Sequence, residues 1–143
     1  MKKFLLTGVA CTLVAFFLSF LIHGVILEPY YSTLAARGVF RTPEDAANYS
    51  YLMIIAHVLI GFAFAWIFIR GHEPGKPWYL QGIRYAFAII CLSTLPWYLI
   101  YYVVQPLSGA LVGQQIIYDS VAVMINGLVA AFINKDRAAV PAE

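Results

Sequence analysis

The chain has 143 residues, of which 62% are hydrophobic, 16% aromatic and only 11% charged, and its formal net charge is +2. A soluble domain usually has about 25% charged residues, so this chain has too few polar side chains to cover a globule in water. The composition excludes an ordinary soluble enzyme, a disordered chain and a nucleic-acid-binding protein. It predicts one membrane domain over residues 1–143.

Apolar segments recur along the whole chain. A helix needs about 20 mostly apolar residues to cross a bilayer. Spans of that kind lie at residues 4–27, 52–70, 83–104 and 111–133. The first span is longer than the apolar region of a signal peptide, so we expect it to be retained. The predicted fold is all-α, a polytopic membrane protein with a bundle of four transmembrane helices.

The connection at residues 28–50, the outer loop, contains a strong helix start. Thr42 is a good N-cap, and Pro43 suits the first helical position. The second helix is therefore predicted to begin near Pro43 and to run unbroken to Arg70, two turns beyond the membrane span that starts at Leu52.

Two further local features are predicted. Residues Tyr31–Arg37 form a short interfacial helix that ends at Gly38. Pro96 kinks the third span or opens its hydrogen bonding at that turn.

The positive residues predict an orientation, because basic loops stay in the cytoplasm. With the N-terminus inside, only Arg37 and Arg41 lie outside, where acidic residues offset them. Both termini are then cytoplasmic, and the expected location is a bacterial inner membrane. The residues placed inside are Lys2, Lys3, Arg70, Lys76, Arg84, Lys135 and Arg137.

Polar side chains inside the spans mark where chemistry would occur, because they are costly in lipid. Counted at 1.5 Å per residue, His23, His57 and Asp119 all lie about 6–12 Å below the outer surface. Two imidazoles and a carboxylate on three helices therefore converge on one level. We expect them to be supported by Glu28, Ser19, Gln115, Tyr118 and Asn126.

Three interpretations of His23, His57 and Asp119 stay open. Two histidines with a carboxylate are the ligand types of a transition metal, and two histidines alone are those of a haem. A buried aspartate beside histidine also suits a proton relay for a proton-coupled small-solute path. The simplest alternative is structural, with His23 bonded to Asp119 and His57 bonded to a tyrosine. No metalloprotease, CxxC or haem-attachment motif occurs in the sequence.

Two stretches carry a resemblance to known proteins. They are His23-Gly24-Val25-Ile26-Leu27 with Pro29-Tyr30-Tyr31, and Tyr101–Pro106 leading into Gln114–Asp119. With the four short spans, they make the chain resemble small four-helix proteins of bacterial inner membranes. The resemblance implies a location and carries no activity, cofactor or catalytic residue with it.

The small size of the bundle sets the expected function. Four short helices leave little room for a substrate cavity, so the first hypothesis is a non-enzymatic accessory protein. It would associate with itself or with a larger membrane complex, in contact with the lipid bilayer. A metal- or haem-binding protein is the first alternative, and a proton-coupled small-solute path is the second.

Overall fold

The structure is a computed structural model that describes residues 1–135, and the regular structure in that range is all helical, with no strand. The helices long and apolar enough to cross a membrane are Lys2–Ile26, Ser50–Arg70, Trp78–Val104 and Gly109–Asn134. For the described residues, the predicted all-α class with four such helices is therefore confirmed. Arg137, used in the orientation prediction, lies outside the described residues, as does the rest of segment 136–143.

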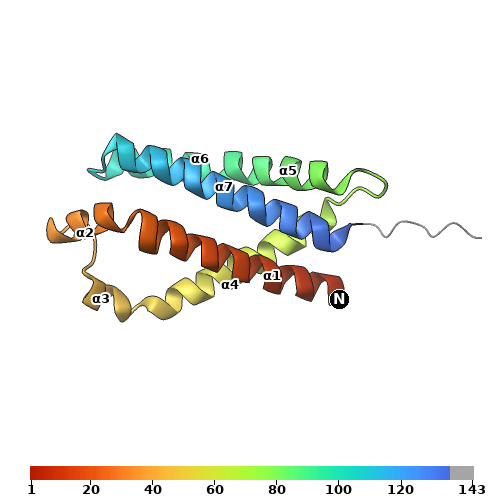
Figure 1. The fold of residues 1–143 in the computed structure, drawn as a ribbon, viewed down its shortest axis with the longest axis horizontal. Helices are drawn as coiled ribbons and strands as arrows, with labels where there is room; N and C mark the ends of the chain where they lie inside the picture. The colour runs from red at the N-terminus through yellow and green to blue at the C-terminus, as the bar shows by residue number, and fades with distance from the viewer. Residues whose placement is uncertain (136–143) are drawn as a thin grey trace, which may run out of the picture.

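The chain passes four times along the bundle, with two π-helical segments and two short helices between or within the long ones (Figure 1). In order, the elements are α1 (Lys2–Ser19), η1 (Phe20–Ile26), α2 (Glu28–Ala36), α3 (Pro43–Ala47), α4 (Ser50–Arg70), α5 (Trp78–Ile89), η2 (Ile90–Thr94), α6 (Leu95–Val104) and α7 (Gly109–Asn134).

The connection between the first two long helices differs from the prediction at one point. Thr42 caps α3 as expected, since its side chain accepts a hydrogen bond from the Asp45 amide at 3.4 Å. The helix does not run unbroken to Arg70, because the chain leaves helical geometry at Tyr49 before α4 begins. Asn48 and Tyr49 make short i→i+3 bonds there, the tightened turn that ends many helices.

The third long helix is interrupted where Pro96 was expected to disturb it. Proline has no amide hydrogen, so the turn before it loses a regular hydrogen bond. The backbone opens into the π-helical segment η2 immediately before Leu95 and Pro96, which confirms that expectation. The helix starts earlier than predicted, at Trp78, because Pro77 and the side chain of Gln81 organise its first turn.

Close helix contacts depend on small residues in the middle of the bundle. Helix α1 packs mainly on α4 and also on α7, while α5 packs on α7. A Cβ atom on Gly61 would come within 2.1 Å of the Thr12 hydroxyl, and one on Gly127 within 2.6 Å of the Gly82 carbonyl. Small residues thus let these backbones approach, as small residues do in known membrane bundles.

The bundle has two halves along its length. One, here the terminal half, holds the N-terminus and the end of α7; the other, the α2 half, holds α2 and the α6–α7 turn (Figure 1). The terminal half is filled by a cluster of Cys11, Phe64, Phe68, Ala130 and Ala131. The α2 half has its own cluster of Ile22, Leu27, Leu34, Leu107, Leu111 and Val112. Of the residues predicted to share one level, His23 lies in η1, His57 in α4 and Asp119 in α7.

Candidate functional site

His23 is placed by the π-helical end of the first long helix. In η1 the amide of Leu27 donates to the carbonyl of Ile22 at 2.8 Å, an i→i+5 bond that widens the turn. Such π-turns are rare in helices and occur often at functional sites. The widened turn brings the imidazole of His23 into the bundle, between α7 and the following helix α2.

His23 uses both ring nitrogens. Its Nε2 lies 3.2 Å from Oδ1 of Asp119 on α7, and its Nδ1 lies 2.6 Å from the hydroxyl of Tyr31 on α2. The His23 and Tyr31 rings are also nearly parallel, with an interplanar angle of 22°. The imidazole therefore joins three separate helical segments.

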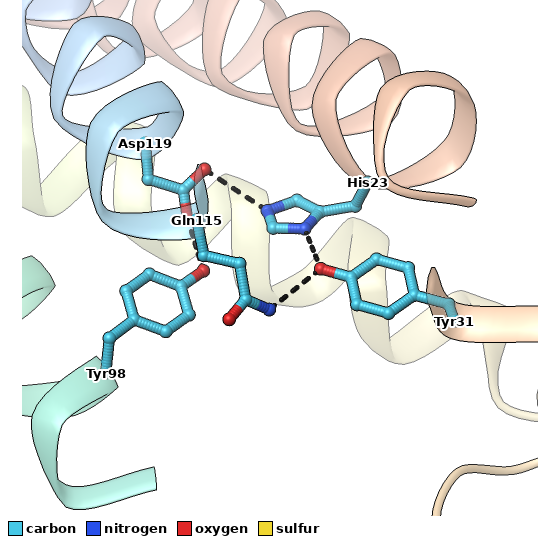
Figure 2. Close-up of polar contacts among 5 residues, drawn as sticks. All are labelled: His23, Tyr31, Tyr98, Gln115 and Asp119. Atoms are coloured by element: carbon cyan, nitrogen blue, oxygen red, sulfur yellow. Dashed lines mark hydrogen bonds and ion pairs between the residues drawn. The ribbon is translucent and has the colours of Figure 1, made fainter. Parts of the chain in front are cut away.

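Two more side chains complete this arrangement (Figure 2). Tyr98 on α6 donates its hydroxyl hydrogen to Oδ2 of Asp119. Gln115, one turn before Asp119 on α7, donates its amide hydrogen to the Tyr31 hydroxyl at 2.9 Å. We name these five residues, His23, Tyr31, Tyr98, Gln115 and Asp119, the His23 network.

The Gln115 hydrogen bond defines one consistent arrangement of the protons in the network. Because Gln115 donates to the Tyr31 oxygen, the Tyr31 hydroxyl is left to donate to Nδ1 of His23. Burial raises the pKa of the Tyr31 phenol; the Gln115 hydrogen bond lowers it in part, and the charge of Asp119 raises it. The phenol thus stays a donor. In this arrangement the hydrogen of His23 is the one on Nε2, which donates to Asp119.

An aromatic cavity of about 440 Å³ adjoins the network in the α2 half. Its walls include two glutamines, Gln105 and Gln115, whose side-chain oxygens are buried and have no hydrogen-bond partner within residues 1–135. Buried oxygens of this kind are unusual and call for a donor. The aromatic side chains that line this cavity are Tyr31, Phe40, Trp97, Tyr98 and Tyr101.

A second, central cavity of about 350 Å³ lies between the long helices and is lined by His23, His57 and Asp119 together. His57 is buried, with 9% of its surface exposed, and its Nδ1 donates to the Met53 carbonyl at 2.6 Å. The three residues that sequence depth placed at one level all line this cavity. In residues 1–135, the direct bond found among the three joins His23 and Asp119.

The residues predicted to support the site are placed differently from one another. Ser19 and Asn126 line the central cavity, and Gln115 belongs to the His23 network. Glu28 is exposed at the start of α2, in a third hollow that His23 also lines. Tyr118 packs instead against the hydrophobic cluster of the α2 half.

Sequence reasoning missed three members of the site. Tyr98 was not predicted to be part of the site, although it binds Asp119. Tyr31 was expected at the start of a short interfacial helix rather than in the site, and Gln105 was not predicted to line a cavity. Tyr31 lies about two helical turns after His23 in the sequence. That spacing would predict a contact between them only if the helix were known to continue through α2.

The donor set does not fit a metal centre built on His23. In residues 1–135 no three His, Cys, Asp or Glu side chains are arranged to hold a metal ion. Both nitrogens of His23 are already in hydrogen bonds, so ligation of an ion or a haem would require breaking one of them. We therefore derive no chemistry through a metal or haem.

Below the central cavity the bundle is closed. Phe64 lines the cavity and belongs to the terminal cluster, in which Cys11 is fully buried. The polar groups further along are paired with each other, as Asn134 donates to the Thr7 hydroxyl at 2.8 Å. A separate hollow of about 200 Å³ lies between α4 and α5 in the terminal half, lined by Phe68, Gln81 and Arg84 among others, and His23, His57 and Asp119 are not among the residues that line it.

Comparison with known proteins found no family model, no curated protein and no solved structure that matches this chain. The candidate site consequently stands on its own geometry.

Proposed function

We propose that this chain is a multi-pass protein of a bacterial inner membrane with both termini in the cytoplasm. The support is the distribution of basic residues between the two ends of the bundle. The α2 half has Arg37 and Arg41, and Arg41 is neutralised by Asp45 at 2.7 Å. The terminal half and its loops have Lys2, Lys3, Arg70, Lys76, Arg84 and Lys135.

In this orientation the protein binds a small solute from the outer side, in the aromatic cavity, and exchanges a proton at His23 as it does so. One observation carries this proposal. A continuous line of hydrogen bonds runs from Gln115 in the cavity wall through Tyr31 and His23 to Asp119.

The network has two complete proton arrangements. In the first, Gln115 donates to Tyr31, Tyr31 donates to Nδ1 of His23, and His23 donates to Asp119. In the second, His23 carries a proton on each nitrogen, and Nδ1 donates to Tyr31. The Tyr31 hydroxyl then donates to the oxygen of Gln115, whose amide has rotated by half a turn.

A solute that donates to the Gln115 oxygen favours the first arrangement. It holds the amide with its nitrogen toward Tyr31, and Tyr31 then continues to donate to His23. Solute binding therefore weakens the binding of a second proton to His23. By linkage, that second proton weakens solute binding by the same free energy.

The closed terminal half supports binding at one face rather than passage across the membrane. A proton-coupled path would need polar or hydrated groups beyond Asn126, where the described chain has the packed side chains of Cys11 and Phe64. In the second proton arrangement the line of hydrogen bonds ends at Gln115, in the wall of the aromatic cavity.

Nitrogen NMR of the histidine rings in lipid nanodiscs tests the proton arrangement. We expect the hydrogen of the singly protonated His23 ring to lie on Nε2, and the Glu73→Gln variant, in the loop between α4 and α5, to leave this unchanged. A His23 with its hydrogen on Nδ1 would contradict the proposal, because Tyr31 would then have no acceptor in the ring.

A second candidate function is association with another copy of the chain. The observation that favours it is the first two turns of α4, where Tyr51, Leu52, Met53, Ile54 and Ile55 are each about half exposed or more. This segment is covered by no other part of residues 1–135. Mass photometry in nanodiscs tests the idea; a monomer at all concentrations would contradict it.

A further inference from the structure

The geometry points to an organic ammonium ion as the solute of the aromatic cavity: a cation with N–H donors on a small apolar body. This inference rests on the proposed binding function and adds the chemical class of the ligand. It follows from the unpartnered acceptors, the aromatic walls and the charge nearby, which are independent features of the site.

The unpartnered acceptors require a donor. Gln115 is 6% exposed, and its side-chain oxygen, like that of Gln105, has no hydrogen-bond partner in the described chain. In Figure 2 the amide of Gln115 lies between Tyr98 and Tyr31, with its nitrogen toward Tyr31 and its oxygen away from it. A ligand with several N–H groups would satisfy both oxygens, since each accepts one.

The walls favour a positive ligand. Trp97, Tyr98 and Tyr101 come from one helix, α6, and Tyr31 and Phe40 face them from the other side of the cavity. Aromatic faces carry partial negative charge and attract an ammonium group within about 6 Å. The rings also offer apolar surface to the body of the ligand.

The charge of Asp119, close to the cavity, also favours a positive ligand. Asp119 lies directly behind the wall, bonded to Tyr98 and His23, and while His23 is neutral its charge is not compensated within the network. Among residues 1–135, no lysine or arginine lines the aromatic cavity. An anionic ligand would meet no lysine or arginine and two unpartnered acceptor oxygens, so the cavity favours a cation over a phosphate or a carboxylate.

The test is calorimetric titration of the whole protein in nanodiscs with 2-phenylethylammonium, against the neutral probe 2-phenylethanol and the anionic probe phenylacetate. Empty nanodiscs give the partitioning into lipid, which is subtracted. We expect saturable binding of the ammonium only. Equal binding of the alcohol would overturn the role of charge, and no saturable binding of the ammonium would overturn the inference.

A matched pair of variants shows whether binding occurs in this cavity. Gln115→Leu removes the acceptor and should weaken ammonium binding about tenfold or more. Gln114→Leu, which removes a hydrogen bond to Tyr30 outside the cavity, should change it less than about threefold. Equal losses in the two variants would place the binding elsewhere and overturn the inference.

A variant that is expected to bind more tightly distinguishes a change in the binding site from a failure to fold. Gln105→Glu puts a carboxylate where the unpartnered oxygen now lies, and we expect ammonium binding to strengthen at neutral pH. Weaker binding by a variant with wild-type thermal stability would overturn the inference. The histidine NMR experiment is independent of these titrations, so the proton arrangement of His23 stands or fails separately from the class of ligand.

Discussion

The two halves of this bundle use polar side chains in different ways. In the terminal half, Asn134 and Thr7 pair locally while glycines bring α5 and α7 into contact. In the α2 half, aromatic residues line a cavity, and the His23 network joins polar residues of η1, α2, α6 and α7 beside that cavity and the central one.

This difference shows how to separate structural polar groups from candidate functional ones in a membrane bundle. A polar pair that joins two packed helices needs no space around it, and its hydrogen bonds are complete. The His23 network has space on two sides and ends in an oxygen, on Gln115, with no partner among residues 1–135. The predictions below test this contrast, from the largest effect to the smallest.

Gly127→Ala should cause the largest loss of stability, about 3 kcal/mol. The added Cβ would lie 2.6 Å from the Gly82 carbonyl and 2.8 Å from the Cβ of Ala86, so α5 and α7 must separate. Thermal or detergent-induced unfolding measures the loss. Gly113→Ala on the same helix is the control, because in the described chain nothing lies within 4 Å of its added Cβ. Equal effects would show that close packing does not distinguish the halves.

Asp119→Leu should destabilise the α2 half by about 2 kcal/mol, since it leaves the His23 N–H and the Tyr98 hydroxyl without an acceptor. It should also abolish the difference in binding between 2-phenylethylammonium and 2-phenylethanol. Unfolding curves and calorimetry measure the two effects, with Glu28→Gln as the exposed control. A variant as stable as wild type that still prefers the ammonium would refute the role of Asp119.

The depth count along the helices could predict which residues share one level, since it needs only the rise per residue. The four apolar helices, the cap at Thr42 and the disturbance at Pro96 also followed from local chemistry. The count could not predict the π-turn that places His23 or the continuation of the chain into α2, which brings Tyr31 to His23. Tyr31 enters the site only through those two features.

The break at Tyr49 shows a second limit of local patterns. A good N-cap at Thr42 predicts where a helix starts and contains no information on where it ends. The aromatic residues of α6 show a third limit of local patterns. A tyrosine such as Tyr98 is equally compatible with a membrane interface and with a buried hydrogen bond. Only the position of Asp119 on the facing helix α7 decides between them.

Asn134→Ala should cost about 1 kcal/mol, the value of an ordinary buried hydrogen bond, because it removes the bond to Thr7. We expect no change in ammonium binding, since the residue lies in the terminal half. Thr7→Val is the partner variant, and the double variant should cost less than the sum of the two. A change in ligand affinity in either variant would mean that the halves are coupled.

The smallest effect concerns the loop between α4 and α5. Hydrogen bonds from Lys76 and Arg84 lower the pKa of the exposed Glu73 to about 2. The stabilisation is therefore present above the ordinary value of 4.5 and is lost as the pH falls toward about 2. Carboxyl NMR should show the titration of Glu73 moving upward in Arg84→Gln, with Arg70→Gln as the control. An unchanged titration would contradict this ion pair.

The pH dependence of ammonium affinity tests the central claim most directly. His23 is faced by Tyr31, Tyr98 and Asp119 in the network, by His57 across the central cavity and by Glu28 in the third hollow. We predict that the affinity for 2-phenylethylammonium falls as the solution is acidified, because ligand binding and a second proton on His23 oppose each other. His23→Gln should remove most of this dependence, while His72→Gln, in the loop between α4 and α5, should keep it. The same pH dependence in His23→Gln as in wild type would contradict the account.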